Sequence, residues 1–477
     1  LEKEQALAAC HCAVAEAMSL CANAPPPARA LIEALAVRFP QTEIPDDGVL
    51  AAWERAYADA MIPVYKAFGD DPDVAALYID SQIMLTPWQI FDVDKRAPNP
   101  EARESEIQAA LEHSLAGTGA DHIGVLHFDI HVQEMSPTPE KALPSARRLQ
   151  ELAPPDAGHL QHMPSHIHAL VGDFDEATRC SRLSMATDKR FIAKLHRSPF
   201  YRTLVCHNIH MLMFAGMQTG NLADADAAAI VMAEILENVL VHLPVTHMDM
   251  TLEGYYATIT HVDVRFGRWQ QIADREFKGD PAFMPVSHAM HYQARAVALA
   301  ALGRHEEADM AAADFDAERV RVPAGYAYFN NQADDILAVG AAMMRGEIAY
   351  HAGETEAGFE WLREAVAAED RLIYNEPRAW MHPPRHALGA LLLEQGRIDE
   401  ARVIYERDLG YDDELPVSRQ NRGNVWSLLG LVECYEKLCD QRAGDAGAAL
   451  AAVLPLADQP MSSSCFCRGR AGVSDKA

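Results

Sequence analysis

The chain has 477 residues, of which 49% are hydrophobic, and its formal net charge is −28 at pH 7. The hydrophobic content excludes a disordered chain, and the length suits one large domain or two ordinary domains. The negative charge argues against nucleic acid as a partner, because phosphate binding needs clustered lysines and arginines.

Alanine and leucine are abundant, whereas β-branched and aromatic residues are sparse, so we expect an all-α fold. In chain order, the N-terminal segment has a helical pattern with a break at the three prolines 25–27. Further helices are predicted over 75–91 and 107–115. The periodicity is lost from about residue 441, which predicts a mobile C-terminal tail over 441–477.

A short pattern that contains glycine recurs between segments of helical length. Glycine can adopt the left-handed conformation that ends a helix, and an acidic residue soon after it favours the start of the next helix. Successive glycines are 36 to 50 residues apart. The pattern predicts repeated helical hairpins, which must stack in order to bury their apolar faces. These glycines are Gly172, Gly220, Gly267, Gly303, Gly353 and Gly396.

Small residues also occur seven positions before three of the turn glycines, at Ala296, Gly346 and Gly389. Together these features resemble the tetratricopeptide repeat family, in which a small residue packs the first helix. The resemblance covers about residues 120–435, although the spacing exceeds that family's repeat of about 34 residues. It implies a single domain over 1–440, built as an α-solenoid of stacked helical hairpins whose concave face binds ligands.

Histidines recur at offsets of three, four and seven in three successive stretches of the chain. Such offsets place the members of each stretch on one face of their own helix. A lone histidine in a helix is usually a surface or hydrogen-bonded residue, but repetition on neighbouring helices favours a metal or polar-ligand site. The stretches contain His127 and His131, then His159, His162 and His166, then His207 and His210.

The repeat frame places these histidines on one wall. The resemblance implies that positions 2, 5, 9, 12 and 13 of each first helix line the groove when the turn glycine is position 15. With Gly172 as the turn, His159, His162 and His166 take positions 2, 5 and 9. We therefore predict a groove formed mainly by residues 120–270. The neighbouring repeats contribute His207 and His210 with Gly220 as the turn, and His127, His131 and Glu134 with Pro137 in its place.

Neutral imidazole is the commonest protein ligand for transition metals. A site rich in histidine and poor in carboxylate suits copper or zinc, and nearby methionines favour copper because thioether is a soft ligand. Glu134, as a ligand or a general base, would favour iron or a hydrolytic metal instead. The histidines exceed the need of one closed zinc site, so we expect one or two ions, copper first. The predicted metal ligands are His127, His131, His159, His162, His166, His207 and His210.

Other residues are predicted to bind a substrate in the same groove. In the repeat frame, His261 takes position 9 and His386 takes position 5 of later repeats. His247 follows Pro244 near a predicted helix start, where it would close the edge of the groove. Arg378 would bind an anionic substrate group, although a structural salt bridge is the commoner role for such a residue.

The string GHLQHMPSH over residues 158–166 carries a second resemblance. With the histidines before and after it, the string is similar to a hallmark of a group of tetratricopeptide-like proteins of uncharacterised activity. The match spans about residues 70–433. It implies a site and does not indicate the reaction.

Nine cysteines are present without a paired framework, which disfavours a secreted disulfide scaffold. We find no apolar run of about 18 or more residues and no signal-peptide pattern, so we expect no membrane span. The expected location is the cytoplasm.

The leading functional hypothesis is a copper-dependent oxidoreductase that acts on a small organic metabolite bound in the groove, with a homodimer as one possible assembly. One alternative is a non-catalytic repeat adaptor for a peptide or protein partner. That role predicts lysine, arginine and asparagine in the groove, and the predicted lining is histidine. Another alternative is a zinc- or iron-dependent hydrolase or isomerase with Glu134 as the base.

Overall fold

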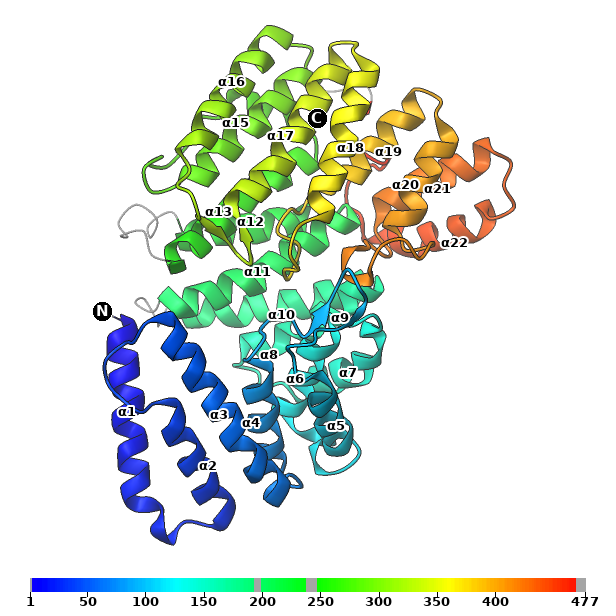
Figure 1. The fold of residues 1–477 in the computed structure, drawn as a ribbon. Coiled ribbons are helices and arrows are strands. Elements are labelled where there is room, and N and C mark those ends of the chain that lie inside the picture. The colour runs from blue at the N-terminus through cyan, green and yellow to red at the C-terminus, as the bar shows by residue number, and fades with distance from the viewer. Residues whose placement is uncertain (1, 193–198, 237–246, 469–477) are drawn as a thin grey trace. The chain divides into compact units, whose positions relative to one another are not determined.

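The computed structural model describes residues 2–192, 199–236 and 247–468. Most of these residues lie in helices (Figure 1). Strands are confined, within these ranges, to two short antiparallel pairs. The predicted all-α class is therefore confirmed. The pairs are Phe91–Asp92 (β1) with Ala97–Pro98 (β2), and Ala327–Tyr328 (β3) with Asn331–Gln332 (β4).

The chain divides into two compact units, Leu1–Ala153 and Pro154–Ala477, and each is described by itself. The sequence predicted a single domain over 1–440 and did not indicate this boundary. Helical periodicity runs through both units, so the hydrophobic pattern carries no mark of the division. Two consecutive prolines, Pro154 and Pro155, begin the second unit.

The helices of the first unit are α1 (Glu2–Leu20), α2 (Pro26–Arg38), α3 (Asp47–Phe68), α4 (Pro72–Ile83), α5 (Glu104–Leu115), α6 (Ile123–Gln133) and α7 (Leu143–Leu152). The predicted break at residues 25–27 is confirmed, since Pro26 starts α2, where a backbone N–H is not needed. The helix predicted over 75–91 ends earlier, at Ile83. Pro87 explains this, because proline disfavours helix in the residue before it and cannot donate a hydrogen bond.

The second unit is also helical, and consecutive helices pack against one another along much of its length (Figure 1). Its buried side chains form one hydrophobic core that extends from Phe174 to Cys467. The helices are α8 (Gly158–His162), α9 (Pro164–Val171), α10 (Phe174–Ile192), α11 (Pro199–Thr219), α12 (Leu222–Leu236), α13 (His247–Arg265), α14 (Trp269–Asp274), α15 (Pro285–Ala301), α16 (His305–Arg321), α17 (Ala333–His351), α18 (Thr355–Asp370), α19 (Pro384–Glu394), α20 (Ile398–Asp408), α21 (Val425–Lys437) and α22 (Ala443–Val453).

All six predicted turn glycines adopt the left-handed conformation, with φ between +63° and +92°. Each lies between two helices that pack on each other, from α9 and α10 at Gly172 to α19 and α20 at Gly396. A residue with a Cβ would be strained there, which is why glycine ends these helices. The predicted helical hairpins are therefore present at these six turns.

The small residues predicted to pack the first helices also lie at helix crossings. A Cβ on Gly346 of α17 would lie 2.7 Å from Cγ of Leu362 in α18. A Cβ on Gly389 of α19 would lie 2.5 Å from Cζ of Tyr405 in α20. Both distances are shorter than a van der Waals contact, so glycine permits the close approach of the two helices.

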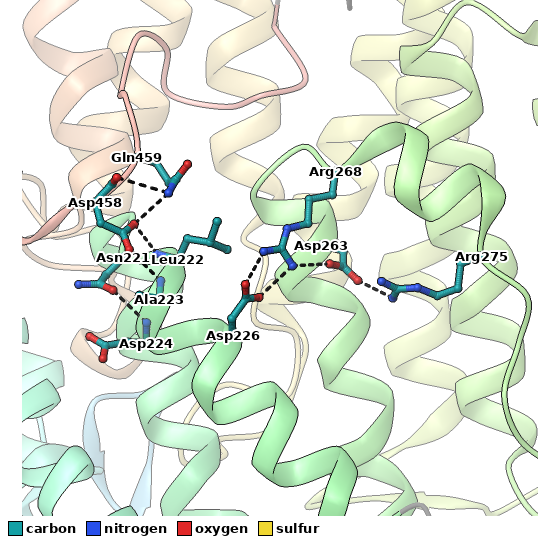
Figure 2. Close-up of polar contacts among 10 residues, drawn as sticks. All are labelled: Asn221, Leu222, Ala223, Asp224, Asp226, Asp263, Arg268, Arg275, Asp458 and Gln459. Atoms are coloured by element: carbon teal, nitrogen blue, oxygen red, sulfur yellow. Dashed lines mark hydrogen bonds and ion pairs between the residues drawn. The ribbon is translucent and has the colours of Figure 1, made fainter. Parts of the chain in front are cut away.

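The described part of the segment after residue 440 is folded, so the predicted tail is wrong for residues 443–468. Helix α22 occupies its start, and the Asp458 carboxylate accepts hydrogen bonds from the backbone N–H groups of Leu222 and Ala223, both at 2.8 Å (Figure 2). This carboxylate satisfies two donors at the start of α12 that the helix itself leaves unpaired. The Tyr405 and Ser464 hydroxyls are hydrogen bonded at 2.5 Å.

The cysteines are not all unpaired. Cys465 and Cys467, both buried, form a disulfide. Most of the others, among them Cys206 and Cys434, are thiols. The sequence did not indicate the disulfide, because a spacing of two residues is not a framework pattern.

One apolar helix departs from the expectation of no membrane-length segment. Residues Glu4–Asn23 have a mean hydropathy of 1.3 over a length that could cross a membrane. Length and composition alone are weak evidence, because a signal sequence or a core helix has the same character.

Candidate metal centre

Three histidines of the second unit bring their Nε2 atoms close together. His162 ends α8, His166 lies in α9, and His207 lies in α11. The Nε2 atom of His162 lies 2.8 Å from that of His166 and 3.0 Å from that of His207. His162 and His166 are buried, and His207 is partly buried. We call this set the histidine trio.

Local sequence explains why His162 and His166 share a face. Met163 alone separates α8 from α9, and the two histidines are four residues apart, which is about one helical turn. Pro164 is tolerated between them because it occupies the first turn of α9. The predicted pairing of these two side chains is present in the structure.

The buried carboxylate of Asp188 connects α10 with α8 and α11. Asp188 of α10 accepts a hydrogen bond at 2.7 Å from Nδ2 of Asn208, the neighbour of His207. A Cβ on Gly158, which starts α8, would lie 2.2 Å from Oδ1 of the same carboxylate. Glycine at this position therefore lets α8 begin against Asp188, and the contacts of Asp188 link α8, α10 and α11.

The rings of the histidine trio are steeply inclined to one another. The angles between ring planes are 81° for His162 and His166, 74° for His162 and His207, and 65° for His166 and His207. An imidazole nitrogen carries either one hydrogen or one lone pair, in the plane of the ring. His162 Nε2 therefore cannot make a good hydrogen bond to both neighbours, whereas one cation could accept all three lone pairs.

The second ring nitrogens of His162 and His166 face partners that favour this arrangement. Nδ1 of His166 lies 3.4 Å from Oε2 of Glu376. Nδ1 of His162 lies 3.4 Å from Oγ of Ser165, whose hydroxyl donates to the His162 carbonyl at 2.6 Å. Both partners can accept a hydrogen from Nδ1, which leaves the Nε2 lone pair for a metal.

The spacing of the histidine trio is close to that of a metal site. Metal–nitrogen bonds of about 2.0–2.1 Å around a tetrahedral ion separate its ligand nitrogens by roughly 3.3 Å. The observed separations of 2.8 and 3.0 Å therefore need to widen by a few tenths of an ångström to hold an ion.

Sequence reasoning missed Glu376. This residue lies between α18 and α19, in a segment without helical periodicity, and it is buried beside His166. No local motif marks it, because its role depends on a contact between residues that are far apart in the chain. Only the fold brings the two together.

His159 and His210, both predicted as ligands, lie outside the histidine trio. The ring centroid of His159 is 6.1 Å from that of His162 and 5.9 Å from that of His207. His210 packs against the rings of Tyr255 and Phe329, at 5.4 and 5.6 Å. Burial, with a smaller effect of nearby His261, lowers the pKa of His210 to about 3, so its ring is neutral.

The remaining predicted ligands belong to the first unit. His127 and His131 both lie in α6, with ring centroids 4.7 Å apart. Nδ1 of His131 lies 2.8 Å from Oε1 of Glu134, which is almost fully buried. Glu134, predicted as a catalytic base, thus holds the ring of His131 in this unit.

Two predicted substrate residues, His261 and His386, are buried in the interior of the second unit. His261 is buried against Trp380, with ring centroids 4.4 Å apart, and burial lowers its pKa to about 3. His386 accepts a hydrogen bond from Arg265 at 2.8 Å and lies 3.0 Å from the Asp408 carboxylate. These contacts of His386 join α13, α19 and α20.

The other two predicted substrate residues are His247 and Arg378. The side chain of His247 lies outside the described part of the chain, although its backbone begins α13. Arg378 lines the small cavity described next.

A small cavity of about 40 Å³ lies beside His166 and Glu376. Its lining combines apolar residues, which we call the apolar wall, with polar residues, which we call the polar wall, and such a mixed lining is typical of a ligand site. The apolar wall includes Leu170, Phe174, Met211 and Phe214, and the polar wall includes Asn375, Arg378, Gln420 and Asn421. The cavity gives a small molecule room next to one member of the histidine trio.

No protein-family model matches the chain, and no curated protein matches it. The inference of function therefore rests on the geometry of the site.

Proposed function

We propose that this protein is a metal-dependent oxidoreductase, with copper as the metal and a small organic molecule as the substrate. The observation that carries the proposal is the convergence of three imidazole Nε2 atoms in the histidine trio, at 2.8 and 3.0 Å from the central His162. Three ligands leave an open position on the ion, which catalysis requires and a closed structural site lacks.

Copper is supported by the chemistry of the donors. The histidine trio contains no thiolate and no carboxylate, and imidazole sites bind Cu²⁺ more tightly than the other divalent ions of the first transition row. Met211 lines the cavity beside His166 and offers a soft thioether nearby. Glu376 lies behind His166 as a positioning residue, because it faces Nδ1.

Bound copper would supply one-electron redox chemistry at this site. The net reaction that we propose is a two-electron oxidation by dioxygen. The substrate loses two electrons and two protons, and dioxygen takes them up and leaves as hydrogen peroxide. The cavity beside His166 would hold one end of the substrate, and Glu376 would hold the imidazole of His166 in place.

We also propose that His127 and His131 bind a second ion in the first unit, with the Glu134 carboxylate beside Nδ1 of His131.

The six glycine turns support a tetratricopeptide-like α-solenoid for the second unit. The described thiols outnumber the cysteines of the Cys465–Cys467 disulfide, which supports a reducing compartment such as the cytoplasm.

Metal analysis tests the proposal. After loading with Cu²⁺ and desalting, we expect about one tightly bound ion in the second unit, lost in His162→Ala and in His207→Ala. Glu376→Gln should weaken binding by roughly 10- to 100-fold, because it changes the partner of a ligand and not the ligand. His305→Ala is the matched control, since His305 is an exposed histidine of the same unit. Less than about a fifth of an ion per chain, unchanged in His162→Ala, would contradict the proposal.

Zinc-dependent hydrolysis is the second candidate, because three histidines and one open position also form a hydrolytic zinc site. Oxygen consumption separates the two functions. The copper-loaded protein should consume dioxygen and form peroxide with an oxidisable substrate, whereas a hydrolase should consume none.

A further inference from the structure

The polar wall of the small cavity contains an acceptor atom without a partner. Asn421 is 3% exposed, and its Nδ2 donates to Oδ1 of Asp408 at 2.7 Å. Burial disfavours the charged form of Asp408, but His386 and hydrogen bonds from Asn421 and Ser427 hold its pKa below the ordinary value. Asp408 is therefore ionised and can only accept, so the amide nitrogen of Asn421 must face it.

The orientation of that amide turns Oδ1 of Asn421 away from the Asp408 carboxylate. Within the described residues, this oxygen is buried and makes no hydrogen bond. A buried acceptor without a donor costs free energy, and such an atom on a residue that lines a cavity points to a ligand that donates to it. The cavity therefore favours a ligand with an N–H or O–H group.

The same cavity also has a donor. Arg378 lines it, and its guanidinium carries N–H groups at several positions and has no acceptor atom. Nη2 donates to the Ser418 carbonyl at 3.3 Å, which fixes one edge of the group. Glu376, a second acceptor, lines the cavity on the side of His166. A ligand that fits must pair with both kinds of group.

The size of the cavity and the charge of its lining restrict which ligands can bind in it. A water molecule needs roughly 10–15 Å³ of such space, so the cavity of about 40 Å³ holds about three or four non-hydrogen atoms. A carboxylate would place a negative oxygen against the carbonyl of Asn421 and the carboxylate of Glu376. A ketone would leave Oδ1 of Asn421 without a donor. A primary carboxamide has both an acceptor oxygen and a donor nitrogen.

We propose that this cavity binds the primary carboxamide end of a small molecule. The carboxamide oxygen accepts from Arg378, and the carboxamide nitrogen donates to Oδ1 of Asn421. The rest of the molecule lies against the apolar wall formed by Phe174 and Phe214. That the carboxamide anchors a substrate of the enzyme rests on the proposed metal centre beside His166. That the cavity binds a carboxamide does not depend on the metal centre.

Three small ligands of the same shape test the proposal without a mutation. Acetamide, acetate and acetone each have four non-hydrogen atoms but differ in donors and charge. Ligand-observed NMR on the metal-free, full-length protein should show acetamide binding in the millimolar range, as expected for so few atoms. It should bind at least about tenfold more tightly than acetate or acetone. Equal binding of the three, tighter binding of acetate, or no binding of acetamide would overturn the proposal.

A matched pair of variants locates the binding. Ala169 lines the small cavity, and Ala233 lines a second cavity of about 830 Å³ elsewhere in the unit. Ala169→Leu should abolish acetamide binding by filling the space, and Ala233→Leu should leave it unchanged. Unchanged binding in a folded Ala169→Leu protein would place the amide elsewhere and refute the assignment. Because these measurements use metal-free protein, they can fail or succeed independently of the metal analysis.

Discussion

Burial sets the protonation state of several polar side chains in the second unit. The pKa of His210 falls to about 3 and that of Glu347 rises to about 8, and the same loss of hydration causes both shifts. Each residue is neutral near pH 7, because its charged form is disfavoured in the interior. Neutral imidazole is the form of histidine that can bind a metal.

Glu347 leads to a testable dependence of stability on pH. Its pKa rises from 4.5 in the unfolded chain to about 8 in the folded protein, so the folded state binds the proton more tightly. Its contribution is complete below about pH 4.5 and is lost as the pH rises to about 8, at roughly 1.4 kcal/mol per pH unit. In urea unfolding at pH 5 and pH 8, Glu347→Gln should remove several kcal/mol of the difference between the two free energies of unfolding. The same difference in both proteins would show that Glu347 is charged in the folded state.

At the scale of helices, the sequence predicted those features that depend on residues close together in the chain. The turn glycines, the helical hairpins and the shared face of His162 and His166 depend on residues a few positions apart. Glu376 and most of the cavity lining could not be predicted, because they bring together residues from segments far apart in the chain, although Arg378 was among the predicted substrate residues. Whether His210 belonged to the site also depended on how α11 is rotated against its neighbours, which the repeat frame does not determine.

Glycines in two environments test the helix packing. Gly389→Ala places a methyl group 2.5 Å from Cζ of Tyr405, where α19 crosses α20. We expect a loss of about 1–3 kcal/mol in the free energy of unfolding, because the crossing is already close-packed. Gly447→Ala, inside α22 with no atom within 4 Å of the added Cβ, should instead stabilise by about 0.5–1 kcal/mol. Denaturant unfolding measures both, and equal effects would contradict the described crossing.

At the scale of the whole molecule, long-range contacts override the periodicity from which the sequence was interpreted. The segment after residue 440 lost its helical pattern, yet Asp458 pairs with the start of α12, and Cys465 and Cys467 are buried. Elsewhere in the unit, Arg268 pairs with Asp226 and Asp263 and so joins α12 to α13 (Figure 2). Neither connection leaves a trace in the spacing of hydrophobic residues.

Shortening the chain tests this view of the C-terminal segment. A protein that ends after residue 440 loses α22, the Asp458 carboxylate and the buried cysteines. We expect its melting temperature to fall by several degrees, since a lost helix cap alone costs about 0.5–2 kcal/mol and buried apolar area is lost as well. A protein that ends after residue 468 is the reference for this comparison, because it keeps the whole of the described C-terminal segment. A melting temperature unchanged by the longer deletion would restore the prediction of a tail.

The pairing of Asp458 with α12 also has a consequence for synthesis. Leu222 and Asp458 are 236 residues apart. At a rate of about 5–20 residues per second, the ribosome needs roughly 10–50 s to make the chain between them. During that time the start of α12 has no carboxylate partner and the core of the second unit is incomplete. The second unit therefore cannot reach its final structure until the segment around Asp458 has been made, and its incomplete core is exposed to aggregation until then.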